Sequence, residues 1–313
     1  MNPNILVAID SSNYYQNILH YLQLLLLKQP AIQFKLLSIV PCHMSLAGKE
    51  WLDQQELMSV IDASTRKKFN ECTNHLHYVK QKFLESGFRE EQLETEVRLS
   101  KAGIAADLVN EEQKKMYDAV VIGKKDLSVI ERMIVGSTST DVLIKNHGLP
   151  VWIINGTVQS PRILVPVDCT AHTLNAVDHL AFILKDNPVA EITLFHSRSL
   201  FASEYITPSE QLYDKWGKDW CDKHLQGEKE GHFHFSAAEQ ILKEAGFPLE
   251  RVTRLETHEG IEPGQQIVKH VKHDKFGTIV MGRRHKDVGK GIFQGVSDRV
   301  LANVSDVAIW ILG

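Results

Sequence analysis

A glycine- and hydroxyl-rich segment joins a strand-like stretch to a helix-like stretch in the first half of the chain. It reads VIGKKDLSVIERMIVGSTST, residues 121–140, and contains Gly123 and Gly136. Phosphate binding requires converging backbone N–H groups, little side-chain bulk and the partial positive charge of a helix N-terminus. This segment meets those requirements, although the same residues also suit a turn and a helix cap. The hydroxyl groups that would donate to phosphate belong to Ser137, Thr138 and Ser139, within the run Ser137 to Thr140.

Two further residues of this half could contact a nucleotide. Asp10 ends the first apolar strand, ILVAID, and its carboxylate would accept from a hydroxyl or from an exocyclic amine. Gly123 ends a later strand, AVVIG, where the missing side chain would let a ribose approach closely. Parallel sheets bind ligands outside the carboxyl ends of their strands, where the strand order reverses. Both residues are therefore expected at the ligand-binding edge.

Four stretches recur in the same order, which indicates an internal duplication. NILVAID returns as RILVPVD, ESGF as EAGF, YDAVVIGKK as FGTIVMGRR, and LPVWII as DVAIWIL, each 158 or 159 residues later. The chain therefore contains two copies of one domain. The segment NGTVQSPR, 155–162, interrupts the apolar pattern, so we predict copies at residues 1–157 and 160–313.

Each copy is predicted to be an α/β domain, an open parallel five-stranded sheet with helices on both faces. Apolar strands alternate with segments of helical periodicity, and strands that are apolar throughout are typical of parallel sheets covered on both sides. The charged segments 51–86 and 209–245 are expected to be helical. The strands are expected within 5–10, 34–40, 93–100, 119–123 and 149–154, and within 163–168, 191–197, 252–259, 278–282 and 306–312.

On these residues the sequence resembles the universal stress protein family in its tandem two-domain form. The resemblance covers essentially the whole chain and rests on ILVAID, on LLSIV and above all on the glycine segment. The ATP-binding branch of the family carries G-xx-G, nine residues, then G-(S/T). Here Gly123 is followed by Asp126 in place of the second glycine, and after nine residues by Gly136-Ser137. The resemblance implies a Rossmann-like, adenine nucleotide alpha-hydrolase-like fold.

The resemblance also implies that the first copy binds ATP or AMP as a regulatory ligand in stress adaptation. The carboxylate of Asp126 would lie near the phosphates and repel them unless Lys124, Lys125 or Mg²⁺ offsets its charge. The implied lining of the site is Asp10, Ile39 (through its backbone, to adenine), Gly123, Gly136, Ser137 and Thr138.

The second copy departs further from the nucleotide-binding pattern. His285 replaces the second glycine and Val296 replaces the serine, whereas the basic pair Arg283 and Arg284 is present. A nucleotide site is therefore expected in the first copy rather than in the second. The candidate site residues of the second copy are Asp168, Gly282, Gly295 and Ser297.

Composition narrows the classes of partner. The chain of 313 residues has a net charge of −4, which gives no reason to expect nucleic acid or an anionic membrane. The N-terminus has no signal-peptide pattern, and the most apolar stretch is shorter than the roughly 20 residues that span a bilayer. The four cysteines form no CxxC pair. We therefore expect a cytoplasmic protein with reduced thiols.

Two other functions stay open beside the nucleotide-responsive module. One is a scaffold or apolar-ligand-binding protein with degenerate loops, and the other is a slow metal-dependent ATP hydrolase that uses Asp10. The sequence contains neither a G-xxxx-GK(S/T) loop nor a GxSxG elbow. No general base stands at a recognisable spacing from the glycine segment, so no strong catalytic centre is expected.

Histidines raise a metal-binding hypothesis in the second copy. His232 and His234 of GHFHF, if they lie on a strand, could bind a metal with His224. Solvated or capping histidines are the preferred interpretation, because no third ligand has a firm spacing. His270 and His273, one helical turn apart, are expected on an exposed helix face.

The fifth strands would be exposed edges in isolated copies. They are apolar and carry Trp152 and Trp310, and an uncovered apolar edge is prone to aggregation. We therefore predict that the two copies pair through these strands within one chain. The family resemblance implies the same pseudo-dimer, which could pair again into a homodimer.

Overall fold

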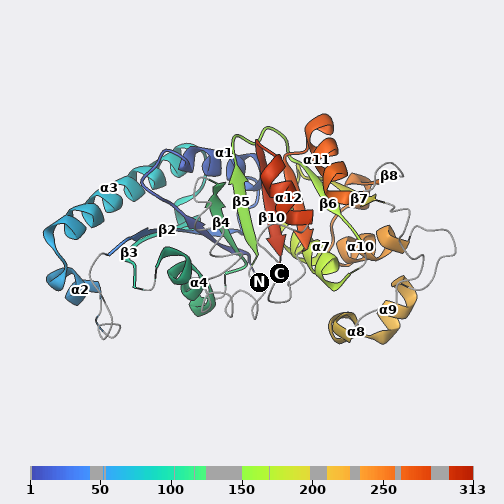
Figure 1. The fold of residues 1–313 in the computed structure, drawn as a ribbon, viewed down its shortest axis with the longest axis horizontal. Coiled ribbons are helices and arrows are strands. Elements are labelled where there is room, and N and C mark those ends of the chain that lie inside the picture. The colour runs from blue at the N-terminus through green and yellow to red at the C-terminus, as the bar shows by residue number, and fades with distance from the viewer. Residues whose placement is uncertain are drawn as a thin grey trace. The chain divides into compact units, whose positions relative to one another are not determined.

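The computed structural model forms two compact units, Met1–Ile154 and Asn155–Gly313, and each is an α/β domain (Figure 1). The glycine segment between 125 and 149 lies outside the described residues, and so does Gly295. The described residues are 2–42, 52, 54–101, 103–115, 117–124, 150–168, 170–197, 210–225, 233–257, 262–282 and 296–312.

The first unit is built on a parallel sheet with the strand order β3-β2-β1-β4-β5. Neighbouring strands run parallel throughout this order. The order reverses between β1 and β4, which is the switch point at which such sheets bind ligands. Its described strands are β1 (Asn4–Ala8), β2 (Gln33–Val40), β3 (Leu93–Leu99), β4 (Ala119–Gly123) and β5 (Val151–Asn155).

The second unit repeats this sheet with the order β8-β7-β6-β9-β10, again parallel between neighbours. The fold class expected from the sequence is therefore confirmed in both copies. Its described strands are β6 (Arg162–Pro166), β7 (Glu191–Ser197), β8 (Val252–Thr257), β9 (Thr278–Gly282) and β10 (Val307–Leu312).

Two of the described helices, α3 and α7, begin at polar residues whose side chains accept from an N–H of the first turn. The carboxylate of Asp62 accepts from the Thr65 N–H, 2.9 Å away, at the start of α3, and Thr170 is the N-cap of α7. The described helices of the first unit are α1 (Tyr15–Leu26), α2 (Gln54–Val60), α3 (Ala63–Glu85) and α4 (Ile104–Lys115). Those of the second are α7 (Ala171–Leu184), α8 (Glu210–Trp216), α9 (Lys218–Leu225), α10 (Phe233–Glu244), α11 (Pro263–Asp274) and α12 (Val296–Asn303).

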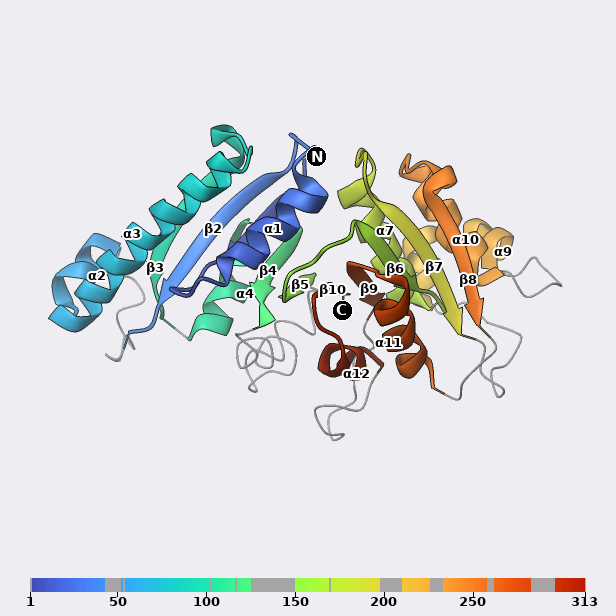
Figure 2. The same ribbon diagram turned by 90° about the horizontal axis from the view of Figure 1, so that it is seen from above.

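Helices cover both faces of the first sheet. Ser38 of β2 lies beside Cys72 of α3, whereas Lys35, three residues earlier, points to the other face, where α4 lies. Figure 1 shows α1 and α3 on one side of β2 and β3 and α4 on the other, and Figure 2 shows α3 running along these strands. The central strand β1 consequently has buried apolar residues in succession, Ile5 to Val7.

The second sheet is covered in the same way. His196 of β7 contacts Phe235 of α10, with ring centroids 6.3 Å apart. The neighbouring Phe195 contacts His270 of α11, at 5.5 Å. Because adjacent strand residues point to opposite faces, α10 and α11 lie on opposite sides of the sheet.

The structure corrects two interpretations of the histidines. Phe233 begins α10, so His234 belongs to a helix and GHFHF does not form the strand that an HxH metal pair would need; His232 lies outside the described residues. His273 is exposed as expected, but His270 is only 20% exposed. Both rings hydrogen-bond Asp274, at 2.7 Å from His270 and 3.0 Å from His273.

Both units require a glycine where the fourth strand meets the helix that follows the first strand. A Cβ on Gly123 would lie 2.5 Å from the ring of Tyr14, and a Cβ on Gly282 would lie 2.3 Å from the backbone carbonyl of His172. The Tyr14 hydroxyl donates to the Ile154 carbonyl, 3.2 Å away, which fixes the ring over the ends of β4 and β5. Close packing therefore explains these glycines independently of any ligand.

We predict that Gly123→Ala lowers the free energy of unfolding by about 1–3 kcal/mol, the usual cost of overpacking. The cost should fall markedly in a Tyr14→Ala background, because the ring that the new methyl group meets is then absent. A double-mutant cycle in urea measures this coupling. Gly282→Ala is the matched control: His172→Ala should not relieve it, because the obstacle there is backbone. Equal costs of Gly123→Ala in both backgrounds would contradict the packing account.

Candidate functional site

A hollow of about 60 Å³ opens at the switch point of the first sheet. It is lined by the ends of β1, β2 and β4 and by the first half of α4. Seven of its eight lining residues are apolar, and Asp10 is the polar one. Its volume is well below the roughly 300–1,000 Å³ of complete ligand pockets, so the described residues supply an apolar floor. The lining consists of Ala8, Ile9, Asp10, Leu37, Ile39, Ile104, Leu108 and Ile122.

The backbone of Ile39 lies beyond the last registered pair between β1 and β2. That pair is Ala8 with Leu37, and the Ile9 N–H donates to the Leu37 carbonyl, 2.9 Å away. Alternate residues of a parallel strand direct their backbone groups to the same neighbour, so Ile39 directs its own groups to the β1 side. They therefore lie at the hollow, where a ring with donor and acceptor atoms could meet them.

One carboxylate oxygen of Asp10 forms a local turn with Ser12. Its Oδ1 accepts from the Ser12 N–H at 3.0 Å and from the Ser12 hydroxyl at 2.7 Å. Among the residues that the structure describes, no donor hydrogen-bonds its Oδ2. The turn fixes the side chain at the hollow, and the second oxygen is the acceptor that a ligand could use.

Asp168, the counterpart of Asp10, has more local partners. Its Oδ1 accepts from the Thr170 N–H at 3.1 Å, from the Thr170 hydroxyl at 2.7 Å and from the Thr173 hydroxyl. Thr173 belongs to the first turn of α7. Asp168 therefore helps to fix the start of this helix.

The second copy also has bulkier residues at positions equivalent to the hollow. Pro166 replaces Ala8, and Phe195 replaces Leu37. The Phe195 ring packs against His270 of α11. These side chains occupy more volume on the face that carries the hollow in the first copy.

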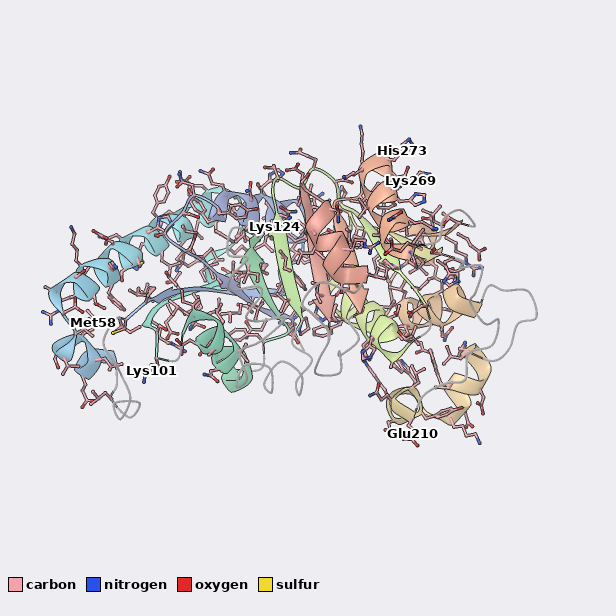
Figure 3. The ribbon with its side chains drawn as sticks, in the orientation of Figure 1. Met58, Lys101, Lys124, Glu210, Lys269 and His273 are labelled. Carbon is pink, nitrogen blue, oxygen red and sulfur yellow. The ribbon has the colours of Figure 1, made fainter. Side chains whose placement is uncertain are left out.

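The structure brings together only part of the predicted nucleotide site. Asp10 and Ile39 line one hollow, and Gly123 ends the adjacent strand, with Lys124 directly after it (Figure 3). Burial lowers the pKa of Lys124. In the second unit, Gly282 ends β9 and Ser297 lies in the first turn of α12. Outside the described residues lie Asp126, Gly136, Ser137, Thr138, Ser139 and Gly295.

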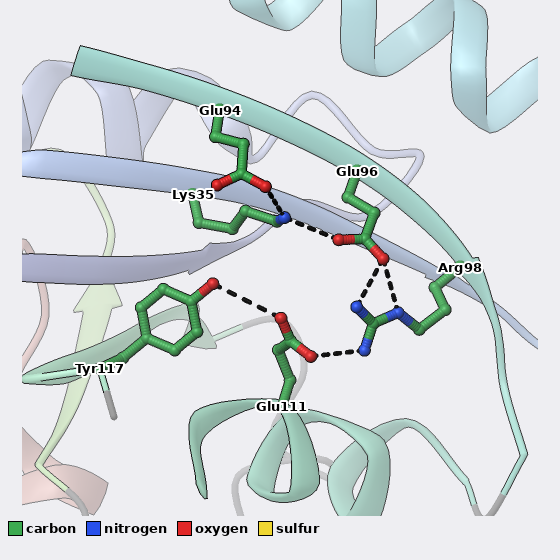
Figure 4. Close-up of polar contacts among 6 residues, drawn as sticks. All are labelled: Lys35, Glu94, Glu96, Arg98, Glu111 and Tyr117. Atoms are coloured by element: carbon green, nitrogen blue, oxygen red, sulfur yellow. Dashed lines mark hydrogen bonds and ion pairs between the residues drawn. The ribbon is translucent and has the colours of Figure 1, made fainter. Parts of the chain in front are cut away.

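Beside the hollow, on the same face of the sheet, lies a network of charged side chains that the sequence analysis missed (Figure 4). Lys35, whose side chain is 2% exposed, contacts Glu94 and lies 2.6 Å from Glu96. Arg98 donates to Glu96 at 2.8 Å and to Glu111 of α4 at 2.5 Å. The hydroxyl of Tyr117 lies 3.5 Å from the other oxygen of Glu111.

The pKa shifts of Lys35, Glu96 and Arg98 favour the charged form of each side chain. Burial opposes the charge on Glu96, but Lys35 and Arg98 hydrogen-bond its carboxylate and lower its pKa. Burial likewise opposes the charge on Lys35, whose pKa is nevertheless raised by Glu94 and Glu96. Burial and the neighbouring Glu111 raise the pKa of Tyr117, which keeps the phenol protonated. The contribution of Glu96 to stability is therefore present at neutral pH and is lost as the pH falls through its lowered pKa.

The second copy replaces the network by neutral residues. Thr193 and Thr253 pair across β7 and β8 where Lys35 and Glu94 pair across β2 and β3, and their hydroxyls lie 2.9 Å apart. Leu255 stands for Glu96, and His270 stands for Glu111. Two signals in the sequence could have revealed the network: a lysine within the apolar strand FKLLSIV, and charges at every second residue of LETEVRLS.

We predict that Lys35→Thr lowers the free energy of unfolding by about 2 kcal/mol, because it leaves two carboxylates close together. This is less than the roughly 3–5 kcal/mol for breaking a fully buried ion pair, since Glu94 is 61% exposed. Adding Glu94→Thr should recover at least half of the loss, because it recreates the threonine pair of the second copy. Urea unfolding of the single and double variants measures this, and simple additivity would contradict it.

Among the described residues, no helix combines the length and apolarity needed to cross a membrane. They also contain no group of three or more His, Cys, Asp or Glu side chains arranged to hold a metal ion.

Comparison with solved structures identifies the fold in other proteins. A crystal structure of a universal stress protein from Archaeoglobus fulgidus is 17% identical, has a TM-score of 0.60, and covers 99% of this chain and 96% of its own. A putative universal stress protein from Pseudomonas aeruginosa is 12% identical with a TM-score of 0.51, covering 99% and 92%. Among curated proteins, no match to the sequence is found.

The family model agrees with the internal duplication. The model of the universal stress protein family matches twice, at residues 1–155 and 160–309, and so covers nearly the whole chain. Both matches fall on a parallel sheet of the same strand order. The chain therefore belongs to the universal stress protein family, in a tandem two-domain form.

Proposed function

We propose that the first copy binds an adenine nucleotide, ATP or AMP, as a regulatory ligand. Tandem domains of this family indicate a stress-response protein, and the proposal gives that protein a small-molecule input. The observation that carries it is the hollow at the switch point, where Asp10, Leu37 and Ile39 converge. Such switch points are where doubly wound sheets bind nucleotides.

The chemistry of the hollow suits an adenine ring. Apolar side chains from Ile104, Leu108 and Ile122 offer contact to a flat aromatic face. The backbone of Ile39 is directed to the same side, where it can pair with the ring edge. The Oδ2 atom of Asp10 can accept from an exocyclic amine or a ribose hydroxyl, and a hydrogen bond to a charged group contributes about 1.5–3 kcal/mol.

The phosphates would extend from the hollow toward the residues after β4. Lys124 follows Gly123 there and supplies positive charge. The hydroxyl run Ser137 to Ser139 and the carboxylate of Asp126 follow in the glycine-rich stretch of the sequence. A Mg²⁺ ion accompanying ATP would offset that carboxylate. The first copy is the better candidate, because Asp168 has three donors on one oxygen and Phe195 replaces Leu37.

A second candidate function is the binding of an apolar ligand in the same hollow. It is favoured by the seven apolar residues of the lining. An apolar ligand would not need the Oδ2 atom of Asp10, so Asp10→Asn separates the two functions.

Pairing of the two copies through β5 and β10, assembly into a homodimer and a cytoplasmic location stay predictions.

We predict that calorimetric titration of ATP with Mg²⁺, or of AMP, gives one micromolar site per chain. Asp10→Asn should weaken binding by about tenfold to a hundredfold, the equivalent of one charged hydrogen bond. Leu37→Phe should abolish binding, because the larger ring fills the hollow. The second copy already has a phenylalanine, Phe195, at the equivalent position. Thermal unfolding of each variant checks that the fold is intact.

Asp168→Asn and Phe195→Leu are the matched controls in the second copy. Neither should change nucleotide affinity. If Asp168→Asn weakens binding as much as Asp10→Asn does, the site is not confined to the first copy. The wild-type protein could instead give no heat with either nucleotide but bind a fluorescent apolar probe, with this probe binding lost in the Leu37→Phe variant. In that case the apolar-ligand function replaces this proposal.

A further inference from the structure

The outer wall of the hollow belongs to the first half of α4, and the next turn of this helix is joined to the sheet by a charged side chain. Ile104 and Leu108 line the hollow, and Glu111, one turn further along, lies on the same face of the helix. The side chain of Glu111 is 2% exposed. Arg98 of β3 and Tyr117, just before β4, both contact its carboxylate. One buried side chain therefore links α4 to β3 and to the residue that precedes β4, the two strands that flank β2 and β1.

The link continues from Glu111 into the centre of the sheet. Arg98 uses one side of its guanidinium for Glu111, at 2.5 Å, and its Nε for Glu96, at 2.8 Å. Glu96 in turn lies 2.6 Å from Lys35 of β2. Leu37 and Ile39 are the next residues of β2 on that face, and both line the hollow. The ion pairs thus connect the helical wall of the hollow with the strand that forms its floor (Figure 4).

The second copy lacks this connection at the equivalent positions. The residue equivalent to Arg98 is Thr257, whose hydroxyl pairs with Gln266 of α11. His270, the counterpart of Glu111, pairs instead with Asp274 of its own helix. The charged connection between this helix and the sheet therefore accompanies the hollow and is a feature of the first copy.

We propose that Arg98 and Glu111 are positioning residues of the nucleotide site: their ion pair fixes α4 on the sheet and so sets the shape of the hollow. The inference rests on the proposed function for its ligand, but its physical content concerns α4 alone. Neither residue contacts the ligand in this account. They act by holding Ile104 and Leu108 at a fixed distance from Leu37 and Ile39.

The test uses the full chain and the double variant Arg98→Met/Glu111→Gln, which removes both charges so that no lone charge is left buried. The matched control is Arg254→Met/Glu239→Gln. It removes another strand-to-helix ion pair, between β8 and α10, with two contacts of 2.6 Å. Arg98→Lys is the conservative variant. It keeps the positive charge and should therefore retain most of the wild-type affinity.

Two readouts separate positioning from simple stabilisation. The first is affinity for ATP with Mg²⁺ by calorimetry, which should fall about tenfold in the double variant, a loss typical of long-range coupling, and not in the control. The second is amide hydrogen exchange without nucleotide. It should become faster in α4, residues 104–111, while exchange in α1 and in α11 stays at the wild-type rate.

Wild-type affinity in the double variant would overturn the inference, and so would unchanged exchange in α4. If the wild-type chain binds no nucleotide, the proposed function fails, and the exchange measurement alone still decides whether the ion pair positions α4. If the double variant does not fold, Arg98→Ala and Arg98→Lys carry the test together. Faster exchange in α4 and weaker binding in Arg98→Ala, but not in Arg98→Lys, support the inference, whereas wild-type exchange and affinity in Arg98→Ala would overturn it.

Discussion

Burial of both sheet faces is the constraint on which the other features of each unit depend. Helices α1 and α3 cover one face of the first sheet and α4 covers the other, so the strands can be apolar throughout. A ligand can then reach the sheet only beyond the strand ends. The strand order reverses between β1 and β4, and the hollow lies at that point. Asp10 and Ile39 line the hollow because their strands end there.

Positions that carry the same residue in both copies have either a shared packing role or different local contacts. Gly123 and Gly282 each allow a strand end to approach the first turn of a helix, and this need is common to both units. Asp10 and Asp168 form the same local turn, in which the Oδ1 atom accepts from the hydroxyl group two residues later. They diverge because Thr173 adds a third donor to Asp168, whereas Tyr15 stands at the equivalent position in the first copy. A shared scaffold thus supports one candidate ligand site and one modified edge.

Much of this architecture could be predicted from the sequence, because it depends on local and periodic patterns. The stretch AVVIG is β4, EITLFHS is β7, and Pro263 begins α11 as expected. The duplication was visible because both copies keep the strand ends. The family and the fold class are confirmed on the same grounds.

The remaining features depend on contacts between residues far apart in the chain. Lys35 meets Glu94 and Glu96 only when β2 and β3 pair, and Glu111 joins them only when α4 docks. No spacing rule connects these positions. Similarly, the role of Gly123 in packing follows from Tyr14, 109 residues earlier in the chain, and His270 is partly buried because Phe195 lies opposite it. Periodicity predicted the faces of these elements but not their partners.

The central claim is that the carboxyl edge of the first sheet, and not of the second, holds an adenine ring. Photolabelling with an 8-azidoadenine nucleotide followed by peptide mapping tests it most directly, because the reactive group sits on the ring. The account predicts labelled peptides from residues 8–10, 37–40 and 104–108, with labelling reduced by excess ATP. Equal labelling of the equivalent peptides around 166–168, 195–197 and 263–267, or labelling that ATP does not reduce, would contradict it.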